Sequence, residues 1–363
     1  MKSIAILTFS RACNYGAVLQ AYALKKYLEN KNYNVQIINY KQKDIENSSK
    51  IFLWKDSNRK FSIRALISSL VYLKFRLSRK LKFWRFSCKY LDRNSKIIHT
   101  YKDIPTNFDI YIHGSDQLWN PKLVGFDKVY WGYYKIKNNS YRITYAMSFE
   151  SNSISKLRQN DIKDALNNFK YISLREDFLI DNLSPFTQKN IYSVLDPTLL
   201  VNSNIWEKFC VKRNTKPYLL FYQVGVTDLN KHIINDISNK LNLKIKVVSG
   251  PILRRNFYKN NPSPEEFLTL LYNASFIVST SFHATTFAII FKKQFYTIAA
   301  NSGSDIRYYS LLSKLSLSDR IINKKDDVDL SKHIDYNNVS IKLEKLKKES
   351  EEYLTKALQD ESL

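Results

Sequence analysis

The sequence predicts an α/β protein with two doubly wound domains that face each other across a cleft. Residues 4–9 form a short apolar run, residues 17–28 repeat apolar side chains at helical spacing, and residues 35–40 form a second β-like run. This βαβ spacing implies a parallel sheet with right-handed crossovers. A second series of the same kind begins after Pro217, beyond an irregular stretch at 197–216. Because 363 residues exceed one ordinary domain, two such units are expected.

Strands and helices continue to alternate within each series. Apolar runs extend the first series at 109–112, 142–146, 171–174 and 191–195, and form the second at 218–222, 244–248, 276–279 and 295–298. Ser263 and Pro264 supply a start signal for the helix between the second and third strands of the later series. We expect a first domain at 1–205, a second domain at 206–338, and a terminal helix at 339–363 for which packing back on the first domain is one arrangement.

The composition excludes several classes of protein. Aromatic residues make up 14% of the chain, which argues against disorder, and 7 glycines and 8 prolines are too few for a collagen-like sequence. No window approaches about 18 consecutive apolar residues, and the first apolar run is too short for a signal-peptide core. Cys13, Cys88 and Cys210 lie far apart without a CxxC or Cys/His cluster, so neither a zinc site nor a disulfide framework is supported. We therefore expect no metal, and a reducing cytoplasm as the compartment.

One segment interrupts the alternation. Residues 52–90 contain 11 Lys and Arg but a single acid, Asp56, and so carry 10 of the 24 net positive charges. Apolar side chains recur there at helical spacing, which predicts a basic amphipathic helical insertion in the first domain. Two interpretations remain open: a helix that covers the domain with a solvated basic face, or an interfacial segment attracted to anionic lipid. No nucleic-acid-binding motif accompanies the charge, and no nucleic-acid partner is expected.

Two polar loops follow predicted strands of the first domain, at the edge where open α/β sheets bind ligands. Asn14, Tyr15 and Gly16 lead into the first helix, where a small residue lets the backbone approach a ligand and free N–H groups face an anion. The turn is not GxGxxG, so a dinucleotide site is not supported. The second loop carries the candidate substrate-binding residues His113, Gly114, Ser115, Asp116 and Gln117. A tight turn and helix capping are the structural alternatives for these loops.

Three further pieces supply cations and an acid–base group. Arg175 at a strand end and Arg307 near a helix start can fork onto a carboxylate or phosphate, although a surface ion pair or a capped surface helix would explain them equally. The turn from a strand into the next helix contains Thr280, Ser281, His283 and Thr285. Hydroxyls and a histidine at a helix N-terminus make an anion site with a general acid or base at neutral pH, whereas a lone histidine is more often structural.

These pieces, in this order, resemble the polysaccharide pyruvyl transferase family from about residue 4 to residue 320. The resemblance rests on LTF-x-x-x-x-NYGAVLQAYAL, GSDQLWNP, SLRED, LDPTLL at 195–200, SPEEFL, STSFHATTF and IRYYSLLSKLSLSDR. It implies two Rossmann-like domains in a glycosyltransferase-B-like arrangement, with the donor bound in the second domain. It also implies transfer of a pyruvyl group from phosphoenolpyruvate, as co-substrate, to a sugar of a bacterial surface polysaccharide or its lipid-linked precursor. The products are a pyruvate ketal and phosphate, and no redox cofactor is needed.

The resemblance also assigns roles. His283 is the first candidate for a donor-site residue, as acid, base or phosphate ligand, and Arg175 and Arg307 form the clamp. The opposite wall would be lined by Asn14, Gly16, Asp116 and Gln117. Two positions depart from the family pattern: Ala284 follows the histidine where glycine is usual, and His113 precedes GSDQ where an apolar residue is commoner.

Two other functions remain open at this stage. A glycosyltransferase that uses a nucleotide-sugar would suit the same architecture, although no carboxylate is clearly placed for the ribose. A non-catalytic assembly factor at the membrane surface would keep the fold and bind through residues 52–90. The expected location is the cytoplasm, with peripheral attachment to the inner face of the membrane as an open alternative.

Overall fold

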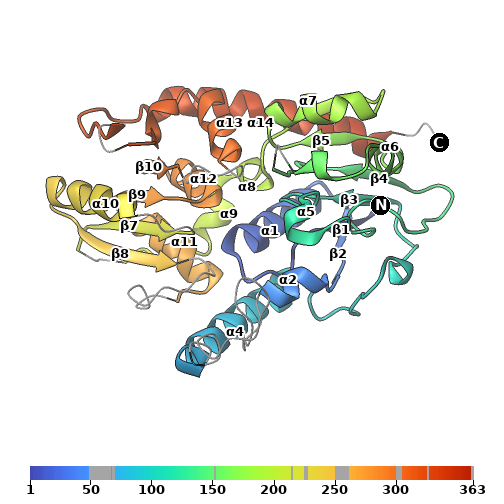
Figure 1. Cartoon of the computed structure of the whole chain (residues 1–363), viewed down its shortest axis with the longest axis horizontal. Coiled ribbons are helices and arrows are strands. Elements are labelled where there is room, and N and C mark those ends of the chain that lie inside the picture. Colours follow the sequence, from blue (N-terminus) through green and yellow to red (C-terminus); the bar gives the residue numbers. More distant parts are fainter. Residues whose placement is uncertain are drawn as a thin grey trace.

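Two parallel sheets organise the chain (Figure 1). The computed structural model describes residues 1–48, 67, 70–150, 153–213, 216–224, 228–249, 261–299, 305–324 and 327–360. The N-terminal half holds a sheet of order β2-β1-β3-β4, made of β1 (Ser3–Leu7), β2 (Asn34–Ile37), β3 (Ile110–His113) and β4 (Tyr141–Thr144). A parallel pair, β5 (Ile172–Leu174) and β6 (Ile191–Ser193), continues beside β4 through bridges from Ile143 to Tyr171 and from Met147 to Leu174.

The C-terminal half holds a second parallel sheet, of order β11-β10-β9-β7-β8. Its strands are β7 (Tyr218–Gln223), β8 (Lys244–Ser249), β9 (Phe276–Ser279), β10 (Gln294–Ile298) and β11 (Ile321–Ile322). β7 is buried along its whole length, because helices cover both faces of the sheet. In both sheets the strand order departs from sequence order, which is the mark of crossover connections. The predicted α/β class with parallel sheets is confirmed.

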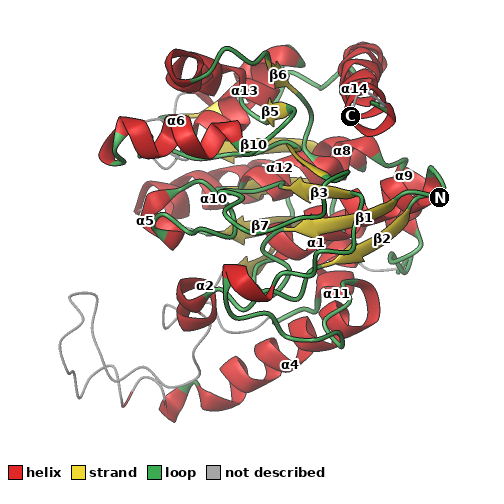
Figure 2. Ribbon diagram, turned by 90° about the vertical axis from the view of Figure 1, so that its right-hand side faces the viewer, coloured by secondary structure: helices red, strands yellow, loops and turns green. Residues whose placement is uncertain are grey.

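Helices connect the strands and pack on both sides of them (Figure 2). They are α1 (Tyr15–Asn30), α2 (Lys43–Ser48), α4 (Leu73–Tyr90), α5 (Pro121–Val124), α6 (Gln159–Asn167), α7 (Ile180–Leu183), α8 (Pro197–Leu200), α9 (Ser203–Glu207), α10 (Asp228–Lys240), α11 (Pro264–Asn273), α12 (Phe282–Ile290), α13 (Ile306–Lys314) and α14 (Tyr336–Gln359). The stretch at 197–216, expected to be irregular, therefore contains α8 and α9. Asp196 accounts for α8, because its side chain accepts a hydrogen bond from the Thr198 N–H and Pro197 follows it.

Two helix starts have the caps that their sequences indicate. Asn14 accepts a hydrogen bond from the Ala17 N–H at the start of α1. At the start of α11, Ser263 and Glu266 cap each other's backbone N–H groups in a reciprocal capping box. Both caps fix where a helix begins beside the space between the two sheets.

One hydrophobic core runs through both halves of the chain. Tyr15 of α1 stacks on Phe267 of α11 with ring centroids 4.2 Å apart, and Trp206 of α9 meets Phe287 of α12 at 4.9 Å. Aromatic pairs of this kind add to the free energy gained by burial alone. The contact between the halves is therefore a packed core, which holds α1 and α12 in a fixed relation.

The last helix, α14, reaches from the second sheet to the first. The Tyr336 hydroxyl donates to the Ala288 carbonyl in the C-terminal half, at 3.3 Å. At the other end, the Tyr353 hydroxyl donates to the Thr144 carbonyl at 2.6 Å, and the Tyr141 hydroxyl donates to the Ala357 carbonyl at 3.0 Å. α14 thus packs on the N-terminal sheet near β4.

Within the basic insertion the structure describes residues 67 and 70–90, which include helix α4, and residues 49–66, 68 and 69 lie outside the described residues. Phe83 and Phe86 are buried on its inner side. Lys82 crosses to the C-terminal half, where its ammonium lies 2.8 Å from the Glu266 carboxylate. Within the part of the chain that the structure describes, no helix combines the length and apolar character needed to cross a membrane.

Candidate active site

A cavity of about 410 Å³ lies between the two halves of the chain. Of the residues that the sequence singled out, it is lined by Asn14, Asp116, Gln117, Thr280, Ser281, His283 and Arg307. These come from the start of α1, the loop after β3, the turn into α12 and the first turn of α13. The two sheets therefore bring segments almost 300 residues apart to one space, at the carboxyl ends of parallel strands where such folds bind ligands.

Helix α4 supplies a third wall of the cavity. Its lining residues are Phe75, Arg76, Arg79 and Lys80. Together with Arg307 they place four cationic side chains on the lining, and Asp116 is the single carboxylate among the described lining residues. Arg79 is fixed by donating to the Cys13 carbonyl at 3.1 Å and by lying 4.9 Å from the Tyr15 ring centroid. The charge of the lining favours an anionic ligand.

Gly16 and His283 meet face to face where α1 and α12 begin. A Cβ atom added to Gly16 would lie 2.0 Å from His283 Nδ1 and 2.4 Å from Cγ, far inside any real contact distance. The glycine is needed here for the close approach of the imidazole. Gly16 was expected to leave room for a ligand. It instead leaves room for the His283 imidazole of the C-terminal half, which lines the cavity.

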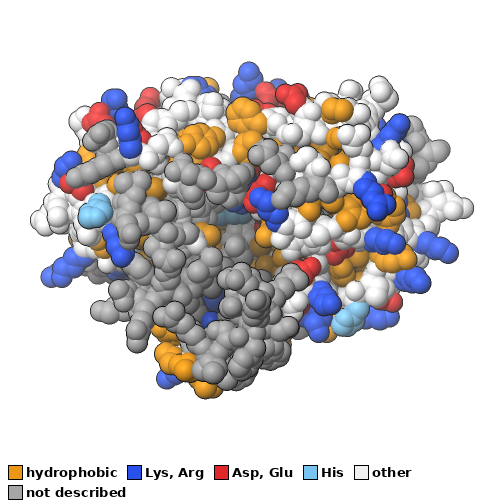
Figure 3. Space-filling view, in the orientation of Figure 1, with side chains coloured by type: hydrophobic (Ala, Val, Ile, Leu, Met, Phe, Trp, Pro, Cys, Tyr) orange, Lys and Arg blue, Asp and Glu red, His pale blue; other side chains and the backbone are white. Residues whose placement is uncertain are grey.

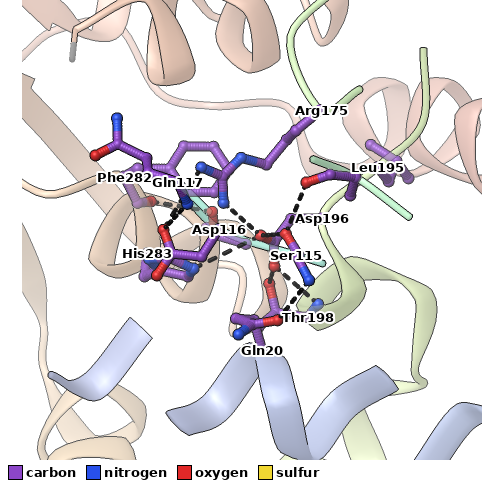
Figure 4. A network of polar contacts seen from close by, with 12 residues as sticks. Gln20, Ser115, Asp116, Gln117, Arg175, Leu195, Asp196, Thr198, Phe282 and His283 are labelled. Atoms are coloured by element: carbon purple, nitrogen blue, oxygen red, sulfur yellow. Dashed lines mark hydrogen bonds and ion pairs between the residues drawn. The ribbon is translucent and has the colours of Figure 1, made fainter. Parts of the chain in front are cut away.

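Asp196 is the buried centre of the polar network behind the histidine (Figure 4). One of its oxygens, Oδ2, lies 2.8 Å from Arg175 Nη1 and 3.6 Å from His283 Nε2. The other, Oδ1, accepts from the Thr198 hydroxyl at 2.7 Å and from the Thr198 N–H at 3.0 Å. Burial alone would raise the pKa of Asp196, but His283, Arg175 and Thr198 hold that pKa well below its usual range.

Arg175 is committed to a buried ion-pair cluster. Its Nε donates to Glu176 at 2.8 Å, its guanidinium lies 4.6 Å from the Phe282 ring centroid, and both carboxylate partners are fully buried. Burial lowers the pKa of a guanidinium, but the charges of Glu176, Asp196 and Asp116 together raise the pKa of Arg175 above its ordinary value. Arg175 therefore stays charged and positions Asp196, rather than lining the main cavity as one arm of a clamp.

A smaller cavity, of about 200 Å³, adjoins the first. Arg175, Asp196 and Lys314 line it, and Arg307 and Phe282 belong to both cavities. Burial and the charge of Arg175 both lower the pKa of Arg307. A negative ligand beside Arg307 would offset that repulsion, so Arg307 is placed to recognise an anion.

Two buried nitrogen atoms on the main cavity lining have no hydrogen-bond partner among the described residues: Gln117 Nε2 and His283 Nε2. Arg175 Nη2 is also buried without a hydrogen-bond partner. Leaving a buried polar group without a partner costs about 1–3 kcal/mol. Such groups are tolerated where a ligand supplies the missing bonds, which makes this part of the cavity the candidate active site.

The loop after β3 is fixed by hydrogen bonds to side chains that do not line the main cavity. Ser115 Oγ lies 3.2 Å from Asp196 Oδ2, and the Ser115 N–H donates to Gln20 Oε1 at 3.1 Å. Gly114 has φ +129°, and a Cβ atom there would lie 2.0 Å from the Tyr145 carbonyl oxygen. Gly114 and Ser115 therefore shape the loop that presents Asp116 and Gln117, without lining the cavity themselves.

Three other predicted site residues lie outside the lining of both cavities. Tyr15 is buried and donates to the Pro262 carbonyl at 2.8 Å. Thr285 is buried in α12, where its hydroxyl lies 2.6 Å from that of Thr297. His113 is fully buried.

His113 was expected among the substrate-binding residues, and the structure places it in the core instead. Its Nε2 lies 2.7 Å from the Tyr134 hydroxyl and its Nδ1 lies 3.1 Å from the Tyr130 carbonyl oxygen. Burial, together with the charge of Arg142, lowers the pKa of His113 to about 3. A histidine that stays neutral and satisfied in this way is a structural residue.

The network contains residues that sequence reasoning did not single out as site residues. Asp196 is the main one, and its signal was an acidic residue before Pro197 at the end of an apolar run. Glu176 was considered only as a surface partner of Arg175, yet it is fully buried. Arg79 belonged to a helical basic pattern in which no single residue stood out.

The described residues contain no group of three His, Cys, Asp or Glu side chains that could hold a metal ion. The polar groups of the site are cationic, amide and hydroxyl side chains, one imidazole, the Asp116 carboxylate and the buried carboxylates around Arg175.

Similarity to solved structures is confined to the fold. A UDP-N-acetylglucosamine 2-epimerase has a TM-score of 0.50 at 10% identity, with 100% of this chain and 97% of that chain covered. UDP-GlcNAc 2-epimerases from Methanocaldococcus jannaschii (15% identity, 94% and 93% covered, TM-score 0.47) and from Neisseria meningitidis (10%, 98% and 94%, 0.45) are more distant. The fold class is that of two Rossmann-like domains in a glycosyltransferase-B-like arrangement, as predicted.

The family follows from the sequence model that matches the chain. The model for polysaccharide pyruvyl transferase covers residues 14–302, which include every lining residue named above except Arg307 and Lys314. The chain belongs to the polysaccharide pyruvyl transferase family. No curated protein sequence matches it.

Proposed function

We propose that this protein transfers a pyruvyl group from phosphoenolpyruvate to a sugar of a bacterial surface polysaccharide or of its lipid-linked precursor. The observation that carries the proposal is the cavity lining, which among the described residues holds four cationic side chains, two buried nitrogens without hydrogen-bond partners and a single carboxylate. Phosphoenolpyruvate carries a phosphate and a carboxylate, so a pocket for it needs this excess of donors and positive charge.

The start of α12 adds to this preference. Ser281 precedes the helix and makes no side-chain capping bond, while Thr280 and Ser281 both line the cavity. The N-terminus of a nine-residue helix carries partial positive charge and N–H groups that suit a phosphate. Arg307, from the next helix, approaches the same space. The phosphate group fits best between these two helix starts.

The reaction can be written with these groups. A proton is delivered to C3 of the enol, which becomes a methyl group, and C2 becomes electron-poor. One sugar hydroxyl bonds to C2, the C2–O bond to phosphate breaks, and a second hydroxyl of the same sugar bonds to C2 to close the ketal. The two hydroxyl protons replace the proton given to C3 and protonate the phosphate, so that the balance closes without a redox step.

His283 is the group placed to move these protons. His283 lines the cavity, and its buried Nε2, which has no hydrogen-bond partner among the described residues, lies 3.6 Å from Asp196 Oδ2. Arg175 holds that carboxylate in place. Arg307 and the cations of α4 would stabilise the departing phosphate.

The first test is ligand binding measured by thermal shift, with phosphoenolpyruvate, UDP-sugars and inorganic phosphate titrated in parallel. A ligand at about 100 times its dissociation constant stabilises a protein by roughly 2.7 kcal/mol, which raises the melting temperature by several degrees. We expect a shift with phosphoenolpyruvate that is lost in His283→Gln and Arg307→Gln.

Two exposed residues provide matched controls. His99→Gln and Arg158→Gln change the same residue types at exposed positions outside the cavity lining, and the phosphoenolpyruvate shift should survive both. A shift with a UDP-sugar and none with phosphoenolpyruvate would contradict the proposal and favour glycosyl transfer. If phosphoenolpyruvate does bind, a ketal methyl signal in the proton NMR spectrum of a glycan acceptor would establish the transfer itself.

A further inference from the structure

Helix α4 has an outer face that no other described element covers. Its inner side chains Phe83 and Phe86 are 0% and 1% exposed, whereas Leu77, Leu81 and Trp84 are 45%, 44% and 46% exposed. Single exposed apolar side chains are ordinary on a protein surface. Here they recur three and four residues apart, which places them in one row along the helix.

The row extends beyond the first residue of α4. Leu70 and Val71, which lie just before the cap residue Tyr72 of the helix, are 57% and 68% exposed. Five of the exposed large apolar side chains among the described residues therefore belong to one 15-residue segment, 70–84. In Figures 1 and 2 this segment lies at the margin of the molecule, and in Figure 3 apolar and basic side chains lie side by side at that margin.

Basic side chains accompany the apolar row. Lys74, Arg85 and Lys89 are exposed on the outer side of the same helix. The helix sequence from Leu73 to Tyr90 contains no Asp or Glu. An apolar stripe flanked by cations and free of acids is the pattern of a helix that lies in the interface of a bilayer, with its apolar side chains among the lipid chains and its cations at anionic headgroups.

We propose that the outer face of α4, defined as Leu70, Val71, Lys74, Leu77, Leu81, Trp84, Arg85 and Lys89, binds the surface of an anionic lipid bilayer. Charge decides between the possible occupants. A second copy of this chain would bring an identical cationic row, and a net charge of +24, against the first. An anionic bilayer complements both the apolar and the basic parts of the face.

The same helix also borders the candidate active site. Phe75, Arg76, Arg79 and Lys80 line the main cavity, on the side of α4 that turns away from the proposed membrane face. Binding at a bilayer would therefore hold the cavity within one helix diameter, about 10 Å, of the headgroups. If the acceptor is lipid-linked, α4 brings the site to it. This last step rests on the proposed function, whereas bilayer binding does not.

The experiment is co-sedimentation of the full-length protein with vesicles, which needs no substrate. Vesicles of phosphatidylcholine alone are compared with vesicles of phosphatidylcholine and phosphatidylglycerol. We expect binding to the anionic vesicles that weakens as salt rises. The charge-reversal variant combines Lys74→Glu, Arg85→Glu and Lys89→Glu, none of which lines a cavity. It should lower the partition coefficient by about 100-fold or more, because each basic residue near the surface contributes to binding.

Matched controls separate the face from the overall charge. A variant with Lys163→Glu, Lys345→Glu and Lys348→Glu reverses three exposed lysines on other helices and should keep most of the binding. An apolar variant with Leu77→Ser, Leu81→Ser and Trp84→Ser should lose binding, whereas Ile341→Ser, at a position that is 73% exposed on α14, should not. Each variant should retain the thermal shift that wild type shows with phosphoenolpyruvate, so failure here and failure of the proposed function are distinguishable.

Tryptophan fluorescence gives an independent readout of insertion. In a Trp54→Phe background, four tryptophans remain, and Trp119, Trp131 and Trp206 are fully buried. Brominated phosphatidylglycerol vesicles should therefore quench Trp84. The absence of vesicle binding, equal binding to neutral and anionic vesicles, or unchanged binding in the charge-reversal variant would overturn the proposal. So would a dimer in sedimentation velocity that the apolar variant dissociates, because the face would then be an interface between two copies.

Discussion

Replacing Gly16 with alanine should displace the His283 side chain from its position in the site. The new methyl group would lie 2.0 Å from His283 Nδ1 in the present geometry. Ordinary contact needs more than about 3.4 Å, so the imidazole has to move by more than 1 Å or the start of α1 has to shift. A displacement of about 1 Å at a reacting group can lower a rate by about 10²-fold. We expect at least that loss of turnover and a weakened response to phosphoenolpyruvate.

The effect on stability has two opposing parts. Alanine is intrinsically better than glycine in a helix by about 1 kcal/mol in the interior, and by less in the first turn. Overpacking a closed contact costs about 1–3 kcal/mol. In wild type the second term should exceed the first, so Gly16→Ala should destabilise the protein by up to about 2 kcal/mol, the difference between these estimates.

A double-mutant cycle with His283→Ala isolates the contact. Removing the imidazole removes the clash, so Gly16→Ala should become neutral or stabilising in the His283→Ala background. The coupling free energy from urea unfolding should therefore be about 1–3 kcal/mol, as for residues in direct contact. If Gly16→Ala destabilises both backgrounds equally, the clash with His283 is not its cause, and the reasoning from the close approach is refuted.

Three other outcomes follow from the network and the core. Asp196→Asn should cost about 3 kcal/mol, because it removes a buried partner of Arg175, and urea unfolding measures the loss. The His113 pKa of about 3 means that the unfolded chain binds a proton below pH 6.5 that the folded protein excludes. His113 should hence make the free energy of unfolding fall by about 1.4 kcal/mol per pH unit as the pH drops from about 6.5 to about 3; His113→Gln should flatten this slope, and His99→Gln, at an exposed position, should leave it unchanged. Incubation with EDTA should leave pyruvyl transfer intact; a loss restored by a divalent cation would show a metal requirement.

The fold was accessible from the sequence because its signals are local. Short apolar runs, start signals such as Ser263 before Pro264, and the alternation of strand and helix patterns all lie within a few residues of each other. The same local reading placed His283, Arg307 and Gln117 at strand ends or helix starts, where the cavity lies. Parallel topology then brings such positions to one edge without further information.

The roles of the other candidate residues depended on tertiary contacts, which the spacing of residues in the sequence does not reveal. Arg175 was expected to reach into the cleft, but its partners Glu176 and Asp196 draw it into a buried cluster. Gly16 was considered in relation to a ligand, and its contact proved to be a side chain 267 positions away. His113 is a polar residue in a loop motif, which suggested a ligand-binding role, but its ring forms a buried hydrogen bond with the Tyr134 hydroxyl. In each case the partner, rather than the residue type, decides the role.

The placement of α14 sets the order in which this protein can finish folding during synthesis. The Tyr141 hydroxyl bonds to the Ala357 carbonyl, 216 positions further along the chain. At about 5–20 residues per second, a ribosome needs roughly 10–40 s to make that stretch. Until then the surface around Tyr141, Tyr145 and Tyr192 lacks the helix whose Tyr353 packs against it. The surface of the N-terminal sheet that α14 covers therefore stays exposed until α14 has been synthesised. During this interval the nascent chain needs protection from aggregation.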